Sequence, residues 1–93
     1  MYYVYILLLK NNQLYKGSTA NLKARLERHQ KGKVKSTKSF LPCKLVHHEC
    51  YLLKSDALRR EKFLKTTEGR RLLRQQIRDI LQKEGISTKN KLI

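Results

Sequence analysis

Glu61 is a charged residue on the apolar side of a predicted helix. At about 100° per residue in a helix, it falls between Ala57 and Leu58 inside the apolar stripe that also holds Leu64. An unpaired carboxylate is costly there, so a cation should meet it. The cation could be Arg25 or Lys62 in an internal salt bridge. It could also be Mg²⁺, which often takes one protein carboxylate and keeps several waters.

Arg25 and His29 could supply a phosphate-binding group and a proton-transfer group. They are four residues apart and fall along one edge of the stripe made by Leu22 and Leu26, so both can point past the packing face toward a sheet. A guanidinium can bind a phosphate through two hydrogen bonds, and an imidazole can take a proton near neutral pH. The alternative is two solvated side chains on a basic helix, and this helix alone favours neither.

Two tyrosines lie on strands that are expected to form a hairpin. Tyr5 and Tyr15 flank the turn signal Asn11-Asn12. A two-residue loop would place the tyrosines on opposite faces of the sheet, whereas a three-residue loop or one bulge would place them on the same face. Propensity does not choose between these loops, and both tyrosines could also be ordinary half-buried strand residues.

The order of apolar segments and turn signals predicts a single α/β domain of the α+β type at residues 1–83, with a tail at 84–93. Strands are expected at 2–9, 14–18 and 44–51, and helices at about 21–30, 56–66 and 70–83. Thr19 or Asn21 is expected to cap the first helix and Ser55 the second. Gly69 is expected to separate the second helix from the third, and Gly85 to end the third. The order β-β-α-β-α-α predicts a three-stranded antiparallel sheet flanked by about three helices.

The charge of the chain indicates an anionic partner. Its 93 residues include 22 Lys and Arg against 7 Asp and Glu, giving a net charge of +15. Clustered cations repel one another in the free protein. Their binding to phosphates is favoured because it releases counterions, so nucleic acid is the expected partner. A membrane surface would favour a basic amphipathic helix with Trp or Phe, and the chain has no Trp and two scattered Phe.

The N-terminal sequence and the cysteines indicate a cytoplasmic protein. No basic region precedes the apolar run 4–9, which is also too short to span a membrane. Cys43 and Cys50 form no CxxC motif and offer no disulfide framework. We therefore expect no membrane association.

Four sequence elements, in order, resemble the GIY-YIG nuclease domain. They are Tyr3-Val4-Tyr5, Tyr15-Lys16-Gly17, Asn21-Leu22-x-x-Arg25-Leu26-x-x-His29 and Ala57-Leu58-x-x-Glu61-Lys62-x-Leu64-Lys65. Together they cover about residues 2–75 at matching spacing. The chain is most similar to the small stand-alone bacterial members, which are similar to the incision domain of excision-repair endonucleases. It departs from the family pattern at Tyr3, which replaces a Gly, and at Lys16, which replaces an apolar residue.

The resemblance implies a metal-dependent endonuclease that hydrolyses phosphodiester bonds in DNA, including structured or branched DNA. Tyr5 and Tyr15 would line the active site, Arg25 would contact the scissile phosphate, and His29 would assist proton transfer. Glu61 would hold one Mg²⁺ or Mn²⁺ ion. Basic residues expected to contact nucleic acid are Lys16, Lys31, Lys33, Lys35 and Lys38.

Phosphodiester hydrolysis needs an activated water, and two groups could take its proton. One is a tyrosine phenol with a lowered pKa, and the other is His29. A single carboxylate argues for one metal ion, because two-metal nucleases need several acids. The alternative function is a non-catalytic nucleic-acid-binding module that kept the same fold.

Overall fold

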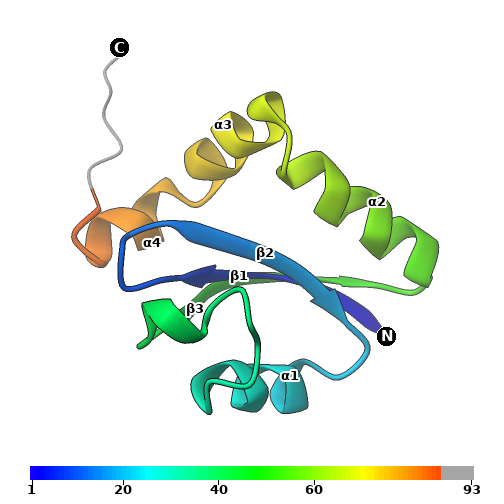
Figure 1. Cartoon of the computed structure of the whole chain (residues 1–93). Coiled ribbons are helices and arrows are strands. Elements are labelled where there is room, and N and C mark those ends of the chain that lie inside the picture. Colours follow the sequence, from blue (N-terminus) through cyan, green and yellow to red (C-terminus); the bar gives the residue numbers. More distant parts are fainter. Residues whose placement is uncertain (87–93) are drawn as a thin grey trace.

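The computed structural model describes residues 1–86, and its sheet and helices form three layers (Figure 1). The antiparallel sheet has the strand order β2-β1-β3, with β1 (Tyr2–Leu8), β2 (Leu14–Thr19) and β3 (Lys44–Tyr51). One face carries α1 (Leu22–Gln30) and the short 3₁₀ helix η1 (Lys38–Phe40). The other face carries α2 (Lys54–Leu64), α3 (Thr67–Gln76) and α4 (Arg78–Lys83). The predicted fold class and element order are confirmed.

The central strand β1 is buried on both faces, as its continuous apolar run indicates. Its even-numbered residues Val4 and Ile6 pack beneath α2, α3 and α4, in the cluster that also contains Ala57, Leu64, Leu73, Ile77 and Leu81. Its odd-numbered residues Tyr5 and Leu7 pack with Leu9 in a second cluster, against Leu22 and Leu26 of α1. The sheet therefore separates two apolar layers, and each site residue belongs to one side of it.

The β1–β2 hairpin has a three-residue loop. Leu9 N donates to Gln13 O at 2.9 Å, Asn12 N donates to Leu9 O at 2.9 Å, and Asn12 has a φ of 68°. An Asn in the left-handed region at the end of such a loop matches the usual three-residue hairpin. The register pairs Leu7 with Tyr15, so Tyr15 shares a face with Tyr5.

The helix ends follow the sequence signals only in part. Asn21 caps α1 through its side chain, as its position predicts, whereas α2 begins at Lys54 after Leu53 with no side-chain cap. The predicted cap at Ser55 is therefore wrong. Gly69 lies inside α3, where any Cβ would collide with the Phe63 carbonyl oxygen, and Thr66 caps that helix.

The predicted single helix at 70–83 is divided at Ile77, between α3 and α4. Leu73, Ile77 and Leu81 are all buried, at successive steps of four residues. Each such step turns a side chain by about 40°, so one straight helix would rotate Leu81 away from the sheet. The break returns it to the core. Gly85, with a φ of 86°, ends α4 as predicted, and the expected tail lies outside the described residues from 87 onward.

An ionic network of partly buried side chains joins α2 to β3. Glu49 of β3 accepts hydrogen bonds from Arg60 of α2 at 3.0 and 3.2 Å, and from Tyr51 at 2.8 Å. His47 Nε2 lies 3.0 Å from Glu49 Oε2. Burial would raise the pKa of Glu49, but the bonds from Arg60, His47 and Tyr51 outweigh burial and lower that pKa to about 2. Arg60 precedes Glu61, so this network fixes the helix that carries the candidate metal ligand.

Replacing Glu49 with Gln should lower the free energy of unfolding by roughly 2–3 kcal/mol at neutral pH. The folded pKa lies below the usual 4.5, so the carboxylate's contribution is present above pH 4.5 and is lost as the pH falls toward 2. Chemical denaturation of both proteins across this range measures the difference. Glu68→Gln, at an exposed ion pair, should change stability little. A difference that does not shrink in acid would contradict the assignment.

Candidate active site

Four of the five predicted site residues meet on the α1 face of the sheet. The Tyr5 phenol oxygen lies 2.8 Å from His29 Nε2, and Arg25 Nε donates to the same oxygen at 3.1 Å. The Tyr15 ring centroid is 5.1 Å from that of His29 and 6.2 Å from that of Tyr5. Tyr5 and His29 are fully buried, while Arg25 is only partly buried. Strand alternation and the i,i+4 spacing of α1 place these side chains together.

Gly17 allows the Tyr5 phenol to reach the edge strand β2. The two residues are directly paired in the ladder. A Cβ at position 17 would lie 2.5 Å from the phenol oxygen and 2.6 Å from the ring carbon that bears it. Any side chain there would displace the ring, so the glycine of the Tyr15-Lys16-Gly17 segment is needed for space.

Thr37 completes a directed chain of hydrogen bonds and was not identified from the sequence. His29 Nδ1 lies 2.8 Å from Thr37 Oγ1, and Thr37 Oγ1 donates to Val34 O at 3.4 Å. Because the hydroxyl hydrogen is used for Val34, Thr37 accepts from His29 Nδ1–H. Nε2 then carries the free lone pair and accepts the Tyr5 hydroxyl. This assignment follows from the hydrogen-bond network.

Burial sets the protonation states of this chain. It raises the pKa of Tyr5 above its usual value; the bond from Arg25 opposes this effect, and the charges of Tyr15 and Glu61 add to it. Of the two proton acceptors that the sequence left open, a tyrosine with a lowered pKa and His29, the raised pKa of Tyr5 favours His29. Burial also lowers the pKa of His29, and Arg25 and Arg28 lower it further. His29 is thus neutral near pH 7 and is the proton acceptor of the pair.

Glu61 approaches the same stretch of β2 from the other face of the sheet. Its Oε1 accepts from Ser18 at 2.7 Å, and its Oε2 accepts from Lys65 at 2.8 Å. The sequence suggested Arg25 or Lys62 as a salt-bridge partner, and both are wrong. Lys65 is one turn along α2, where i and i+4 side chains meet. Ser18 follows Gly17, and the Glu61 charge acts on the pKa of Tyr5, so the carboxylate and phenol flank the same strand edge.

Glu61 fits a single hard cation better than a cage of protein ligands. Within residues 1–86, no group of three or more His, Cys, Asp and Glu side chains comes together. One partly exposed carboxylate, with the rest of the shell left to water and substrate phosphate, is the usual arrangement for Mg²⁺. The Glu61 side chain is 19% exposed and that of Lys65 is 55% exposed, so the lysine can leave without stranding a buried charge.

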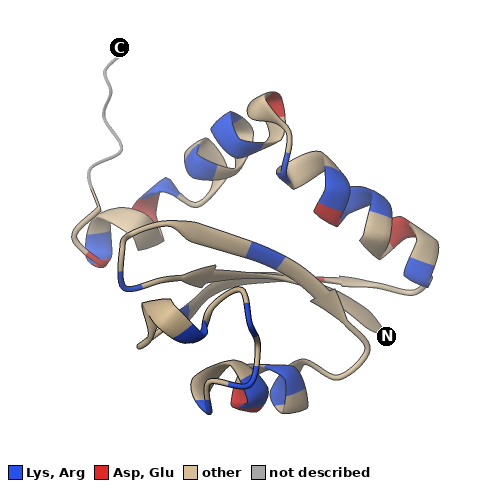
Figure 2. Ribbon diagram, in the orientation of Figure 1, with Lys and Arg blue, Asp and Glu red and all other residues tan. Residues whose placement is uncertain are grey.

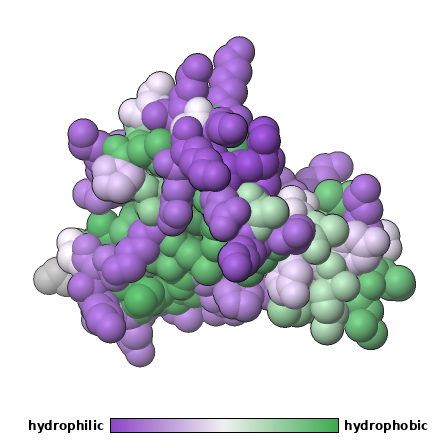
Figure 3. All heavy atoms as spheres, turned by 90° about the horizontal axis from the view of Figure 1, so that it is seen from below, coloured by the Kyte–Doolittle hydropathy of each residue, from purple (hydrophilic) through white to green (hydrophobic). Residues whose placement is uncertain are grey.

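The predicted nucleic-acid-binding lysines do not form one patch. The exposed lysines of the loop after α1 are Lys31, Lys33, Lys35 and Lys38, held in place by the buried residues Val34 and Thr37. Seen from below, the face that carries α1 shows hydrophilic side chains around a central hydrophobic area (Figure 3). Lys16, in contrast, points to the α3 side of the sheet, as its alternation with Tyr15 requires. Lysines and arginines occur on both sides (Figure 2).

Thr37 and Ser18 carried no local signal in the sequence. Thr37 stands among lysines and serines in a basic loop, and its burial depends on how that loop folds back onto His29. Ser18 is an ordinary strand residue until α2 brings Glu61 above it. Both contacts join elements that are distant in the sequence, which periodicity does not report.

The fold and the grouping of tyrosines, arginine, histidine and glutamate match a known class of domain. Residues 1–75 match the model of the GIY-YIG catalytic domain, and the chain therefore belongs to the GIY-YIG family, whose domains are generally nucleases. The resemblance found in the sequence is confirmed. Among residues 1–86, no helix is both long and apolar enough to cross a membrane.

Within this family, the chain is similar to the small UPF0213 proteins. It is 47% identical over 66 residues to one from Staphylococcus haemolyticus, which covers 70% of this chain and 80% of the relative. It is 39% identical over 74 residues to one from Staphylococcus aureus, covering 78% and 90%. The solution NMR structure of a UPF0213 protein from Bacillus halodurans has a TM-score of 0.56 and 28% identity, covering 94% of this chain and all of that one.

Proposed function

We propose that this protein is a divalent-metal-dependent endonuclease that hydrolyses phosphodiester bonds in DNA. The observation that supports it best is the directed chain from Arg25 through Tyr5 and His29 to Thr37. Core packing alone gives no reason to bury a histidine and a phenol beneath an arginine. The chain has the parts that proton transfer at a phosphate requires: an anion-binding group, a proton carrier and an oriented base.

Tyr5 and His29 act together as the general base. A water attacking phosphorus gives a proton to the Tyr5 oxygen as Tyr5 gives its own proton to His29 Nε2, so the phenol remains neutral overall. His29 accepts the proton because it starts neutral, and Thr37 holds its ring in the required tautomer. The raised pKa of Tyr5 suits this relay, since a free phenolate is never needed.

Arg25 binds the phosphate that is attacked. Its Nε is committed to Tyr5 and its guanidinium also interacts with Tyr15, and the group keeps further N–H donors for non-bridging phosphate oxygens. Arg25 makes no salt bridge with a carboxylate within residues 1–86. Its charge therefore meets the negative charge that develops on the pentacoordinate phosphorus.

Glu61 is the residue that would hold the divalent cation at this strand edge. A bound Mg²⁺ or Mn²⁺ would supply positive charge for the departing oxygen. Lys65 must release Glu61 Oε2 for this to happen, and its exposed ammonium can do so at low cost. The lysines of the loop after α1 contact flanking phosphates and are not base-specific.

Incubation with plasmid, branched and single-stranded DNA, and with RNA, tests the proposed function. We expect cleavage with Mg²⁺ or Mn²⁺, none with EDTA, and a preference for DNA. Binding measured with Ca²⁺ should weaken with salt along a log–log slope of several units, because it depends on phosphate contacts. Strong binding without cleavage of any substrate would instead identify a non-catalytic nucleic-acid-binding module.

A further inference from the structure

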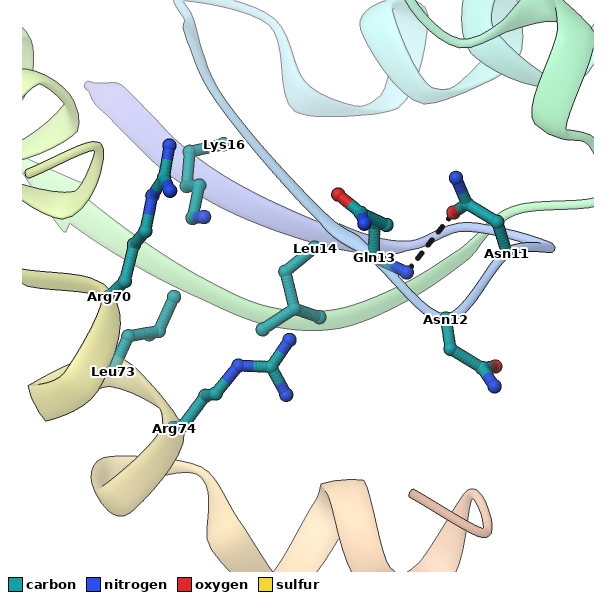
Figure 4. Close-up of a pocket in the computed structure, with 8 residues that line it drawn as sticks. All are labelled: Asn11, Asn12, Gln13, Leu14, Lys16, Arg70, Leu73 and Arg74. Carbon is teal, nitrogen blue, oxygen red and sulfur yellow. Dashed lines mark hydrogen bonds between the residues drawn. The ribbon is translucent and has the colours of Figure 1, made fainter. Parts of the chain in front are cut away.

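A basic pocket lies on the α3 side of the sheet, across β2 from the tyrosines. Its volume is about 360 Å³, and the hairpin loop forms one wall while α3 forms the other. Lys16, Arg70 and Arg74 extend into it (Figure 4). The other lining residues are Asn11, Asn12, Gln13, Leu14 and Leu73. Three cations from two elements therefore converge on one cavity without an acidic residue in its wall.

No Asp or Glu side chain among residues 1–86 is free to neutralise this pocket. All seven acids lie within residues 1–86. Glu27 is on α1 on the opposite face, and the other acids are paired with other cations, in the pairs Glu49–Arg60, Asp56–Arg59, Glu61–Lys65, Glu68–Arg71, Asp79–Arg78 and Glu84–Lys44. Within residues 1–86, Arg71 and Arg78 are thus paired surface arginines, whereas Arg70 and Arg74 have no carboxylate partner.

Crowding of these like charges is unfavourable in the free protein. Burial lowers the pKa of Lys16, and the charges of Arg70, Arg74 and Lys65 lower it further. Lys16 replaces the apolar residue usual in the family and faces a partly apolar wall of Leu14 and Leu73. A cluster of like charges that also partly buries the Lys16 ammonium is best explained by an anion that occupies it.

The position of Lys16 links the pocket to the candidate active site. Lys16, Gly17 and Ser18 are consecutive on the edge strand β2; Gly17 covers the Tyr5 phenol, and Ser18 bonds Glu61. Lys16 and Ser18 share a face and are about 7 Å apart along the strand. A nucleic-acid strand that crosses this edge would meet the metal ligand and the basic pocket within a few nucleotides.

We propose that the pocket of Lys16, Arg70 and Arg74 binds a backbone phosphodiester of the nucleic-acid substrate, close to the phosphate that is cleaved. The guanidinium groups provide bidentate donors, Lys16 provides a point charge, and the Asn12 and Gln13 side chains at the rim can donate from their amides. The proposal rests on the proposed function for the identity of the ligand. It assigns the α3 side of the domain to substrate anchoring, in addition to the lysine loop on the α1 side.

The double variant Arg70→Gln/Arg74→Gln on α3 tests the pocket against Arg71→Gln/Arg78→Gln on α3 and α4, which changes the net charge by the same amount. Binding of a duplex DNA oligonucleotide without a terminal phosphate is measured by fluorescence anisotropy across a salt series. We expect the first variant to bind about tenfold more weakly and its log–log salt slope to fall by about 1 to 2 units. The second variant should keep the wild-type slope. Equal losses in both variants would overturn the proposal, because they would show only a general effect of charge.

Two further measurements separate the remaining outcomes. The melting temperature of Arg70→Gln/Arg74→Gln should hold or rise, because repulsion around Lys16 is relieved, so lost binding would not reflect unfolding. Competition with inorganic phosphate and with a 5′-phosphorylated oligonucleotide separates a phosphodiester site from a terminal-phosphate site. DNA affinity that depends on a terminal phosphate would overturn the proposal. If no substrate is cleaved but the affinity difference remains, the endonuclease proposal fails and the pocket stands.

Discussion

Replacing Glu61 with Gln should reduce metal-dependent DNA cleavage by at least about 10²–10³-fold, the loss expected when one charge-stabilising group is removed from a transition state. Glu61 is the one carboxylate among the described residues that flanks the Tyr5 phenol across β2. The glutamine amide is neutral, so it lacks the negative charge with which the Glu61 carboxylate would bind Mg²⁺. Single-turnover cleavage rates with saturating protein measure the effect without a contribution from weaker binding.

The same substitution should leave the fold and DNA binding largely unchanged. Ser18 can still donate to the carbonyl oxygen of the introduced amide, and Lys65 is left as a solvent-exposed ammonium. We expect the free energy of unfolding to fall by less than about 1 kcal/mol, the range of a partly exposed ion pair. This separates Glu61 from Glu49, whose carboxylate accepts two hydrogen bonds from Arg60 and one from Tyr51.

Thermal melts with and without Mg²⁺ serve as the control. Wild-type protein should gain stability from Mg²⁺ at concentrations above its dissociation constant, and the Glu61→Gln variant should gain less. Glu68→Gln, at an exposed pair on α3, should retain both the gain and the cleavage. Cleavage that survives in Glu61→Gln would refute the metal-ligand role, as would a large loss of stability in metal-free buffer.

Replacing Tyr5 with Phe should reduce the rate of cleavage by about 10²–10⁴-fold, the usual contribution of a general base. The change removes the hydroxyl that links Arg25 to His29 and keeps the ring that packs in the second apolar cluster. His29 Nε2 is then left buried without a donor, which should cost about 1–3 kcal/mol of stability. Tyr51→Phe removes a phenol on the other face, where it donates to Glu49, and should leave cleavage intact.

The pH dependence of the wild-type rate tests the same relay. His29 accepts a proton only when neutral, and its folded pKa lies below 6.5, so the acid limb of the rate should fall below pH 6.5. The stability of the fold should also decrease in acid, because His29 in the unfolded chain takes up a proton at a higher pH than His29 in the folded protein. Its contribution to stability is thus complete above pH 6.5 and is lost as the pH falls through the folded pKa. An acid limb above pH 6.5, or an unchanged rate in Tyr5→Phe, would contradict the relay.

Local periodicity determined the elements and most of the candidate site. The apolar run at β1, the helix cap at Asn21 and the glycine at 85 each act through neighbouring residues, so the sequence shows them directly. The angular positions of Arg25, His29 and Glu61 were also readable, because a helix fixes which side chains share a face. The excess of basic residues indicated nucleic acid without any structure.

Tertiary structure decided the features that depend on one backbone conformation or on distant contacts. The left-handed φ at Asn12 selects the three-residue loop and so brings Tyr15 to the face of Tyr5. The break at Ile77 depends on the curved path that keeps Leu81 in the core. Neither outcome follows from propensity, because competing loops and a straight helix are locally just as acceptable.

Tertiary structure also decided which groups the buried and charged side chains contact. Thr37 orients His29 because a basic loop folds back over α1, and Lys65 meets Glu61 because the carboxylate is only partly buried. The sequence showed arginines along α3 and α4 but not which of them were paired. Glu68 and Asp79 neutralise two of them, while the hairpin brings Lys16 to Arg70 and Arg74, and only a folded chain brings these segments together.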